Sequence, residues 1–233
     1  MKPNVRVVLQ ARTSSRRLPA KVLLPVAGIP LAVLAAKRAM RNGRDLVVAT
    51  SVADSDNLLA GALERQNIQV SRGPLDDVLK RFVLATNDLR ETDVCVRLTA
   101  DNPFPDGDLV DELVSKFRGD CVAYMSASDI VDFEMPIGLS AEVFRVGALR
   151  NAEQLALEPR HREHVTTYIR EHLAEPAVYK NLGIESQTPG LRCTIDTLED
   201  YLQVAGFFSA VADPVGQKWE QLLAAFQDYS RKT

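Results

Sequence analysis

A short polar stretch near the amino terminus is rich in groups that bind phosphate. Its cations are Arg12, Arg16, Arg17 and Lys21, and its hydroxyl residues are Thr13, Ser14 and Ser15. The stretch follows an apolar run of strand length, where its backbone N–H groups and side-chain donors can converge on an anion. Neither GxxxxGK(S/T) nor GxGxxG is present, so these two common nucleotide-binding loops are excluded. We predict a phosphate-binding loop of another kind, the alternative being a solvated basic loop.

Two isolated aspartates have the chemistry to hold a hard divalent cation. Asp101 lies in TADNP after one apolar run, and Asp196 follows another, LRCTI, much later in the chain. Mg²⁺ takes one or two carboxylates and fills its other positions with water and phosphate oxygens. Together with the cations, the pair predicts phosphoryl or nucleotidyl transfer. On spacing alone, Asp101 also suits a turn or the cap of a following helix, and Asp196 suits an N-cap completed by Glu199.

The other charged clusters receive structural interpretations. The Asp-x-Asp triplets at 54–56 and 106–108 stand at expected helix starts, where aspartate is a common cap. Asp76 and Asp77 fall in the first turn of an expected helix, where the helix dipole favours anions. The HREH run at 161–164 is too close-packed for the HExxH pattern, which argues against zinc hydrolysis.

Alternating strands and helices must position these groups in the first half of the chain. Strands are expected at 5–9, 45–50, 68–71, 93–98 and 121–124, and helices at 31–42, 55–66, 75–87 and 108–117. Such alternation predicts parallel βαβ units with right-handed crossovers. Because loops that follow parallel strands gather at one sheet edge, the cationic loop and Asp101 are expected to meet there.

The alternation breaks after residue 124, which predicts a mixed or antiparallel extension. Helices are then expected at 146–157, 162–173, 198–212 and 216–232, and strands at 177–181 and 191–195. We find no linker that divides the chain, and therefore expect one domain over residues 1–233. The excursion at about 125–145 is expected to serve the acceptor side of the site or a two-fold interface, and a homodimer is the expected assembly.

The composition is that of an ordinary globular protein, with 46% hydrophobic and 25% charged residues. The net charge of −3 makes the cationic loop a local feature and argues against non-specific nucleic-acid binding. Cys95, Cys121 and Cys193 lie in separate apolar runs and are expected to be small buried side chains. No apolar window has the length of a signal peptide or a membrane span. We therefore expect a cytoplasmic protein without membrane association.

Six blocks of the sequence resemble, in order, cytidylyltransferases of the acylneuraminate and spore-coat polysaccharide type. The blocks are QARTSSRRLPAKVLLPVAGIPL, RGPLDDVLKRF, VRLTADNPFPD, PIGLSAEVF, HREHVTTYIREH and LRCTIDTLEDY. The resemblance implies a Rossmann-like nucleotidyltransferase fold of the GT-A-like kind, with a mostly parallel sheet flanked by helices and a small mixed extension. It also implies transfer of CMP from CTP to a sugar acid or related acceptor, with release of pyrophosphate, in surface polysaccharide or glycoconjugate biosynthesis. A phosphonate or phosphate acceptor stays open.

The resemblance also implies roles for individual positions. The nucleotide positions are Gln10, Ala11, Arg12, Ser15, Arg17, Lys21, Thr50, Arg72, Thr99 and Asp101, and the acceptor positions are Glu142, Arg162, Glu163 and His164. The catalytic positions are Arg12, Arg17, Lys21, Asp101 and Asp196, with Mg²⁺ on Asp101 and Asp196. The family's usual glycines are replaced by Ser14 and Ala20. Ser140 and Thr194 stand where relatives often have acids, which leaves the acceptor open.

Two other classes of function compete with this interpretation. A sugar-nucleotide-dependent glycosyltransferase would use one of the Asp-x-Asp triplets as its metal motif. A non-catalytic nucleotide-binding subunit would have no need of Lys21, Asp101 and Asp196. Pyrophosphate release from CTP distinguishes a cytidylyltransferase from both.

Overall fold

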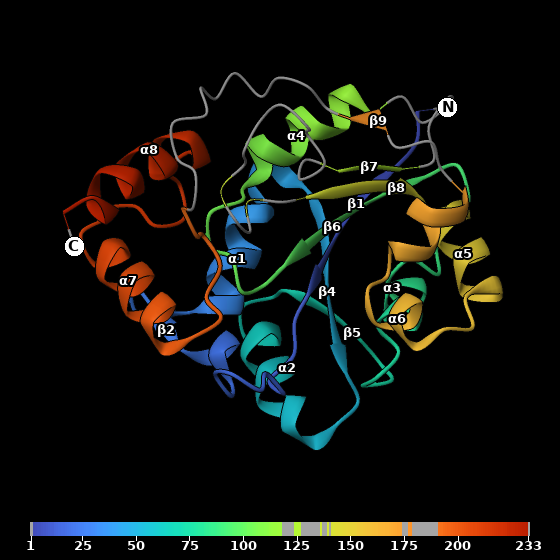
Figure 1. Cartoon of the computed structure of the whole chain (residues 1–233), viewed down its shortest axis with the longest axis horizontal. Coiled ribbons are helices and arrows are strands. Elements are labelled where there is room, and N and C mark those ends of the chain that lie inside the picture. Colours follow the sequence, from blue (N-terminus) through green and yellow to red (C-terminus); the bar gives the residue numbers. More distant parts are fainter. Residues whose placement is uncertain are drawn as a thin grey trace.

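A seven-stranded sheet forms the centre of the computed structural model, which describes residues 2–117, 124–126, 136, 139, 141–173, 177–178 and 191–232 (Figure 1). In spatial order the strands are β5 (Gln69–Gly73), β4 (Asp45–Ser51), β1 (Val5–Gln10), β6 (Val94–Thr99), β8 (Glu142–Arg145), β7 (Tyr124–Ser126) and β9 (Ala177–Val178). The first four are mutually parallel, whereas β8 is antiparallel to both β6 and β7. The predicted α/β fold with a mixed extension is confirmed.

Strand β1 shows why the sheet needs helices on both faces. Val7 and Leu9 pack into one buried cluster, and Val8, which points the opposite way, packs into a second. All three are at most 1% exposed. A strand with both faces buried is expected in a parallel sheet covered on each side.

Helices cover the two faces of the sheet in separate layers (Figure 1). The layer that packs on Val7 and Leu9 holds α1 (Leu31–Ala39), α2 (Asn57–Glu64), α4 (Gly107–Lys116), α7 (Leu198–Ser209) and α8 (Trp219–Ser230). The layer that packs on Val8 holds α3 (Val78–Ala85), α5 (Val146–Leu155), α6 (Pro159–Glu163) and the π-helical turn η4 (Ile169–Leu173). Short 3-10 turns η1 (Lys21–Leu23), η2 (Arg41–Gly43) and η3 (Asp54–Asp56), and a hairpin of β2 (Pro25–Val26) and β3 (Ile29–Pro30), complete the chain.

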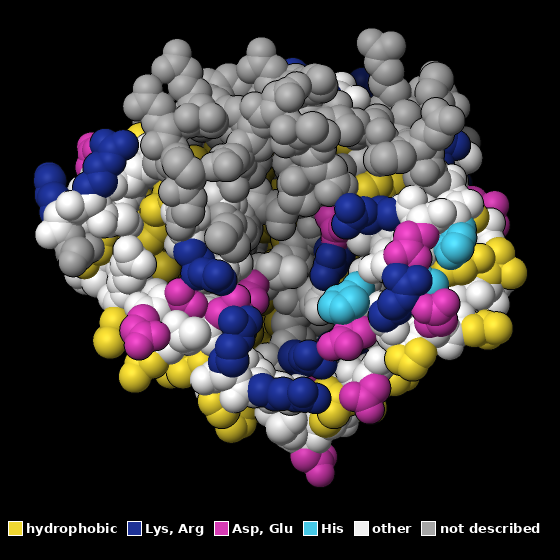
Figure 2. All heavy atoms as spheres, viewed as in Figure 1, with side chains coloured by type: hydrophobic (Ala, Val, Ile, Leu, Met, Phe, Trp, Pro, Cys, Tyr) yellow, Lys and Arg dark blue, Asp and Glu magenta, His cyan; other side chains and the backbone are white. Residues whose placement is uncertain are grey.

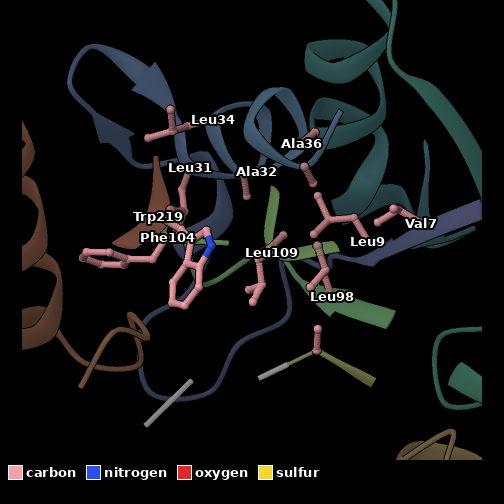
Figure 3. Packing of buried hydrophobic residues seen from close by; sticks show 14 of the residues in the cluster. Val7, Leu9, Leu31, Ala32, Leu34, Ala36, Leu98, Phe104, Leu109 and Trp219 are labelled. Atoms are coloured by element: carbon pink, nitrogen blue, oxygen red, sulfur yellow. The ribbon is translucent and has the colours of Figure 1, made fainter. Parts of the chain in front are cut away.

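Aromatic packing fixes the loop between β6 and α4, which carries Asp101. Phe104 and Trp219 are fully buried beside Leu31 and Leu109 (Figure 3). The Phe104 ring also lies 5.3 Å from the Phe208 ring, edge to face. Burying side chains of this size contributes roughly 2–3 kcal/mol each, so the loop is held firmly against the carboxyl-terminal helices.

Three helix caps decide which aspartates are structural. Asp106 accepts from the Leu109 N–H at the start of α4, as predicted, and Asp77, expected within the first turn of its helix, is instead the N-cap of α3 and accepts from the Lys80 N–H. The alternative of an N-cap on Asp196 is wrong, because Thr197 caps α7 and forms a capping box with Asp200 rather than Glu199. The Asp196 side chain is therefore not used by the helix.

Two expected elements differ from the structure. The helix expected at 162–173 is interrupted, because α6 ends at Glu163, Val165 has a left-handed φ of 51° and η4 begins at Ile169. The run 191–195 forms no strand, and the Ile195 N–H donates instead to the Asp101 carbonyl at 2.9 Å. Most of the 125–145 excursion lies outside the described residues.

Two of the three cysteines are buried as predicted. Cys95 and Cys193 are both fully buried, and burial raises the pKa of each thiol. Cys121 lies outside the described residues. Within the described part of the chain, no helix is both long enough and apolar enough to cross a bilayer.

Candidate active site

A cleft of about 880 Å³ opens where β1 and β6 end. Figure 2 shows a hollow on this face with basic, acidic and histidine side chains gathered around it. The lining residues are Gln10, Ala11, Arg12, Ser14, Ser15, Arg16, Arg17, Lys21, Val22, Leu75, Asp76, Thr99, Asp101, Pro159, Glu163, His164 and Asp196. Segments far apart in the sequence thus meet at the carboxyl edge of the sheet, which is where open α/β sheets bind ligands.

Lys21 joins the two aspartates that the sequence singled out. Its Nζ donates to Asp101 Oδ2 at 2.8 Å, to Asp196 Oδ1 at 2.9 Å and to the Ile195 carbonyl at 2.7 Å. All three ammonium donors are used, and the side chain is only 9% exposed. Since both carboxylates contact one nitrogen, a single cation lies between them.

Further cations surround Asp196. Arg17 contacts Oδ1 at 3.0 Å, and Arg192 donates to Oδ2 at 3.2 Å. Burial alone would raise the pKa of Asp196, but the hydrogen bond and charge of Lys21, followed by the charges of Arg17 and Arg192, hold that pKa below its ordinary value. Asp196 therefore stays ionised at neutral pH.

One carboxylate oxygen of Asp101 is left without a partner by the described residues. Its Oδ1 is buried and has no hydrogen-bond partner among the described residues, while Oδ2 accepts from Lys21. A buried carboxylate oxygen without a partner is costly unless a ligand or water meets it. The donor set of two carboxylates around one cation position fits a hard divalent ion such as Mg²⁺.

The cationic loop is held from beneath by Asp56. Its Oδ1 accepts from the Thr13 N–H at 2.8 Å and from the Thr13 hydroxyl at 2.6 Å, and its other oxygen binds Ser51. Burial would raise the pKa of Asp56, but the hydrogen bonds from Ser51 and Thr13 lower it. The interpretation of the triplet 54–56 as caps is therefore wrong for Asp56, which makes no capping bond and instead anchors the loop.

The loop closes on itself at Ala20. The Ser15 and Ala20 N–H groups both donate to the Thr13 carbonyl at 2.9 Å, and Ala20 has a left-handed φ of 56°. Glycine adopts this conformation without the cost that a Cβ imposes. Ala20 stands where the family that the sequence resembles usually has glycine. The left-handed backbone at this position explains why that family uses glycine here.

One wall of the cleft is formed by the end of α6. Glu163 and His164 both line it, and Arg12 from the opposite loop lies 3.8 Å from Glu163. Both partners are partly exposed, so this ion pair is weak and is easily exchanged for a ligand.

Two of the expected nucleotide residues lie outside the cleft lining. The Thr50 side chain is fully buried, and its hydroxyl donates to Asp56 at 3.1 Å. The Arg72 guanidinium donates to the Ser51 and Ala53 carbonyls and to Asn57 Oδ1.

Two of the expected acceptor residues also lie outside the lining. Arg162 is paired with Asp77 and with Glu153 beside α3. Glu142 is buried on β8 and accepts from Arg97, from Tyr124 at 2.8 Å and from Thr166 at 2.7 Å. Burial would raise the pKa of Glu142, but Arg97 and these hydroxyl donors lower it.

A buried chain nevertheless connects Glu142 to the cleft. Arg97, which binds Glu142, also donates through Nε and Nη2 to Gln10 Oε1 at 3.2 and 3.0 Å. Because the amide oxygen is taken, the Gln10 amide nitrogen is the group left to face the cleft. Arg97 and Glu142 thus orient Gln10.

Three residues that shape the site were not predicted from the sequence: Asp56, Arg97 and Arg192. Arg192 carried a signal, because it stands four residues before Asp196 in LRCTID. Arg97 carried a weaker one, as a charge inside the otherwise apolar strand VCVRLT. Asp76, interpreted as structural beside Asp77, lines the cleft.

Comparisons with known proteins identify the family of the chain. The family described as Cytidylyltransferase matches residues 6–225. The spore coat polysaccharide biosynthesis protein SpsF of Bacillus subtilis (strain 168) is 33% identical over 223 residues, covering 90% of this chain and 88% of its own.

Solved structures share the fold. A cytidylyltransferase from Leptospira borgpetersenii superposes with a TM-score of 0.86 at 24% identity, over 99% of this chain and 96% of its own. The CMP:2-keto-3-deoxy-manno-octonic acid synthetase complexed with CTP superposes with a TM-score of 0.66 at 18% identity, over 88% and 98%. Both show the nucleotidyltransferase fold predicted from the sequence.

Proposed function

This chain belongs to the cytidylyltransferase family, and on that premise we propose that it transfers CMP from CTP to a sugar acid or related acceptor and releases pyrophosphate. The observation that carries the proposal is the position of Lys21 between Asp101 and Asp196, at the bottom of a cleft rimmed by arginines. The similarity to SpsF supports a role in surface polysaccharide biosynthesis.

The cationic end of the cleft suits a triphosphate. Arg12 and Arg17 lie at the rim with partly exposed guanidinium groups, and Lys21 lies deeper. In the proposed reaction these charges neutralise the β- and γ-phosphates and stabilise the pyrophosphate that leaves. Charge placed in advance around a phosphoryl group is the main source of catalysis in such transfers.

Asp101 and Asp196 are proposed to hold Mg²⁺, which when bound would polarise the α-phosphate and help to orient the attacking oxygen. The unpartnered Asp101 Oδ1 supports this assignment. Lys21 now fills the position between the carboxylates, so its ammonium must leave them when the divalent ion enters. Its flexible stem allows it to move toward phosphate oxygens.

The acceptor is proposed to enter along the wall formed by Glu163 and His164. Gln10, oriented by Arg97 and Glu142, would donate its amide hydrogens to the nucleotide or the acceptor. Thr50, Arg72 and Arg162 would then act by holding the loops and helices around the cleft.

A glycosyltransferase is the less favoured function. Of the two Asp-x-Asp triplets, Asp56 is buried beneath the cationic loop and Asp106 is buried as the cap of α4. Neither residue lines the cleft, so neither triplet offers the metal motif that this class would use.

A homodimer and a cytoplasmic location complete the proposal. Most of the excursion at 125–145, expected to build a dimer interface, lies outside the described residues, and light scattering at micromolar concentration would measure the assembly.

Pyrophosphate release tests the proposed function. The full chain is incubated with Mg²⁺, each of the four ribonucleoside triphosphates and a panel of sugar acids, phosphonates and phosphates. We expect release with CTP and one acceptor class. In parallel, CTP should raise the melting temperature more than ATP, GTP or UTP does, because a ligand that binds only the folded state stabilises it. A larger shift with ATP or GTP would contradict the cytidylyl assignment.

A further inference from the structure

Two of the chain's three histidines meet one glutamate outside the cleft. His161 on α6 and His172 on η4 both face Glu171, which also belongs to η4. His161 Nε2 lies 2.9 Å from Glu171 Oε2, and His172 Nε2 lies 3.9 Å from the same oxygen. The three potential ligand atoms all lie within 4.8 Å of one another. None of these residues lines the cleft described above.

The backbone is shaped to bring these residues together. Residues 161, 171 and 172 would not converge on one continuous α-helix, because ten or eleven residues span about three turns. The chain instead turns back at Val165, which has a φ of 51°, and η4 is a π-helical turn. Both are uncommon backbone states, and π turns often occur at functional sites.

We propose that His161, Glu171 and His172 form a binding site for a transition-metal ion of the Zn²⁺ type. Two imidazole nitrogens and one carboxylate oxygen are a common protein ligand set for Zn²⁺, with the fourth position left to water. Tetrahedral bonds of about 2.0–2.2 Å place ligand atoms about 3.5 Å apart. The present contacts of 2.9 and 3.9 Å fall on either side of that spacing.

Arg160 supports the site from behind the glutamate. It donates to Glu171 Oε1 at 2.7 Å and to Oε2 at 2.9 Å, which fixes the carboxylate orientation. Metal-binding carboxylates are commonly held by such outer hydrogen bonds. The alternative interpretation is that no metal binds and that Glu171 serves only as the ion-pair partner of Arg160. In that alternative the 48% exposed His172, which lies beyond hydrogen-bond distance of the glutamate, would serve only to pack its ring 4.5 Å from the Tyr168 ring.

The donor chemistry separates this site from the cleft. Imidazole nitrogens favour Zn²⁺, whereas the oxygen-only pair of Asp101 and Asp196 favours Mg²⁺. A bound ion would join α6 to η4 and so fix the wall that carries Glu163 and His164. The inference concerns metal binding alone and does not depend on the proposed reaction.

Zinc binding by the full chain tests the proposal. Metal-stripped protein is titrated with Zn²⁺ by calorimetry in the presence of millimolar Mg²⁺, and its melting temperature is followed with and without Zn²⁺. We expect one equivalent to bind and the melting temperature to rise. His172→Ala, at an exposed position, and Glu171→Gln should each weaken binding by about tenfold or more.

The third histidine provides the matched control. His164→Ala removes an imidazole from the cleft wall and should leave zinc affinity unchanged. The proposal is overturned if wild-type protein binds no stoichiometric Zn²⁺, or if His172→Ala, folded by circular dichroism, binds it as wild type does. Should His161→Ala fail to fold, the His172 and Glu171 variants still decide the result.

Discussion

Asp101 and Asp106 lie in the same loop between β6 and α4, and each faces basic side chains, yet only one is enclosed. Asp106 is fully buried and accepts from Arg41 at 2.7 Å, from the Trp219 N–H at 3.0 Å and from the Leu109 N–H at 3.1 Å. Asp101 borders the cleft, and one of its oxygens has no partner in the described chain.

A structural carboxylate is distinguished here from a functional one by how many of its oxygens the protein occupies. Around Asp106 both carboxylate oxygens are occupied by protein donors, and Arg38 stands 3.7 Å away. Burial raises the pKa of Asp106 even though its hydrogen bonds and both arginines act against the rise. Around Asp101 the cation that the described residues supply is Lys21, which belongs to the cleft lining. The two regions thus differ in how fully the carboxylate oxygens are hydrogen-bonded, and not in residue type.

The largest expected effect is on turnover at the open region. Asp101→Asn and Asp196→Asn should each lower kcat by about 10²–10³-fold or more, because each removes a carboxylate ligand of the proposed Mg²⁺ and so weakens the positive charge beside the reacting phosphate. The double variant should be little worse than either single variant, since members of one site are not additive. Steady-state pyrophosphate release measures both quantities. Melting temperatures should change little, and multiplicative losses in the double variant would contradict a shared site.

The corresponding substitution at Asp106 should change stability rather than turnover. Asp106→Asn leaves Arg38 and Arg41 without their buried counter-charge, which should lower the free energy of unfolding by about 3 kcal/mol. Urea denaturation measures the loss, and kcat of the folded fraction should stay close to wild type. A stable but inactive Asp106→Asn would show that the two regions are not functionally distinct.

The loss of folding stability at low pH should depend on a third carboxylate, that of Asp93, which lies at the opposite end of β6. Hydrogen bonds from Arg90, and then from the Asn4 N–H, hold its pKa well below the ordinary value despite burial. Such a group stabilises the fold above the ordinary aspartate pKa near 4, and the contribution is lost as the pH falls toward the lowered pKa. Asp93→Asn should cost about 1–3 kcal/mol at neutral pH and flatten the loss of stability below about pH 4.

Denaturation at several pH values distinguishes these outcomes. An unchanged acid slope in Asp93→Asn would assign the acid sensitivity to other carboxylates, among them Glu171, whose pKa is lowered to about 2 by Arg160 and His161.

The smallest expected effect comes from the backbone of the cationic loop. Ala20→Gly removes a Cβ from a left-handed residue and should raise the free energy of unfolding by about 0.5–1 kcal/mol, the strain relieved exceeding the added unfolded-state entropy. Affinity for CTP should stay within about twofold. A loss of stability would show that Ala20 is not strained.

Much of the fold was predictable because local pattern decides it. The apolar run Val5–Leu9, alternating toward two buried faces, specified a central strand, and the loop after it could lie only at the sheet edge. The broken helix after Glu163 was not predictable, since its sequence has helical spacing, whereas the turn is supported by tertiary contacts such as the burial of Val165 and the 2.7 Å bond from Thr166 to Glu142.

The charged residues of the site were predictable, but the residues that hold its loops in place were not. Lys21, Asp101 and Asp196 come together as predicted, but 191–195 forms no strand, and the bond from the Ile195 N–H to the Asp101 carbonyl places Asp196 instead. Asp56 resembled a cap because its partners, Thr13 and Ser51, are brought to it by tertiary structure. Thr50 and Arg72 follow the correct strands, yet β4 ends with Thr50 fully buried and Arg72 turned toward backbone carbonyls.

The most direct test of the central claim is a crystal structure with a non-hydrolysable CTP analogue and Mn²⁺. We expect an anomalous peak within about 2.2 Å of oxygens from both Asp101 and Asp196, with Lys21 Nζ moved onto the phosphates. A nucleotide bound in the cleft with Lys21 still joining the two carboxylates, and no metal between them, would contradict it.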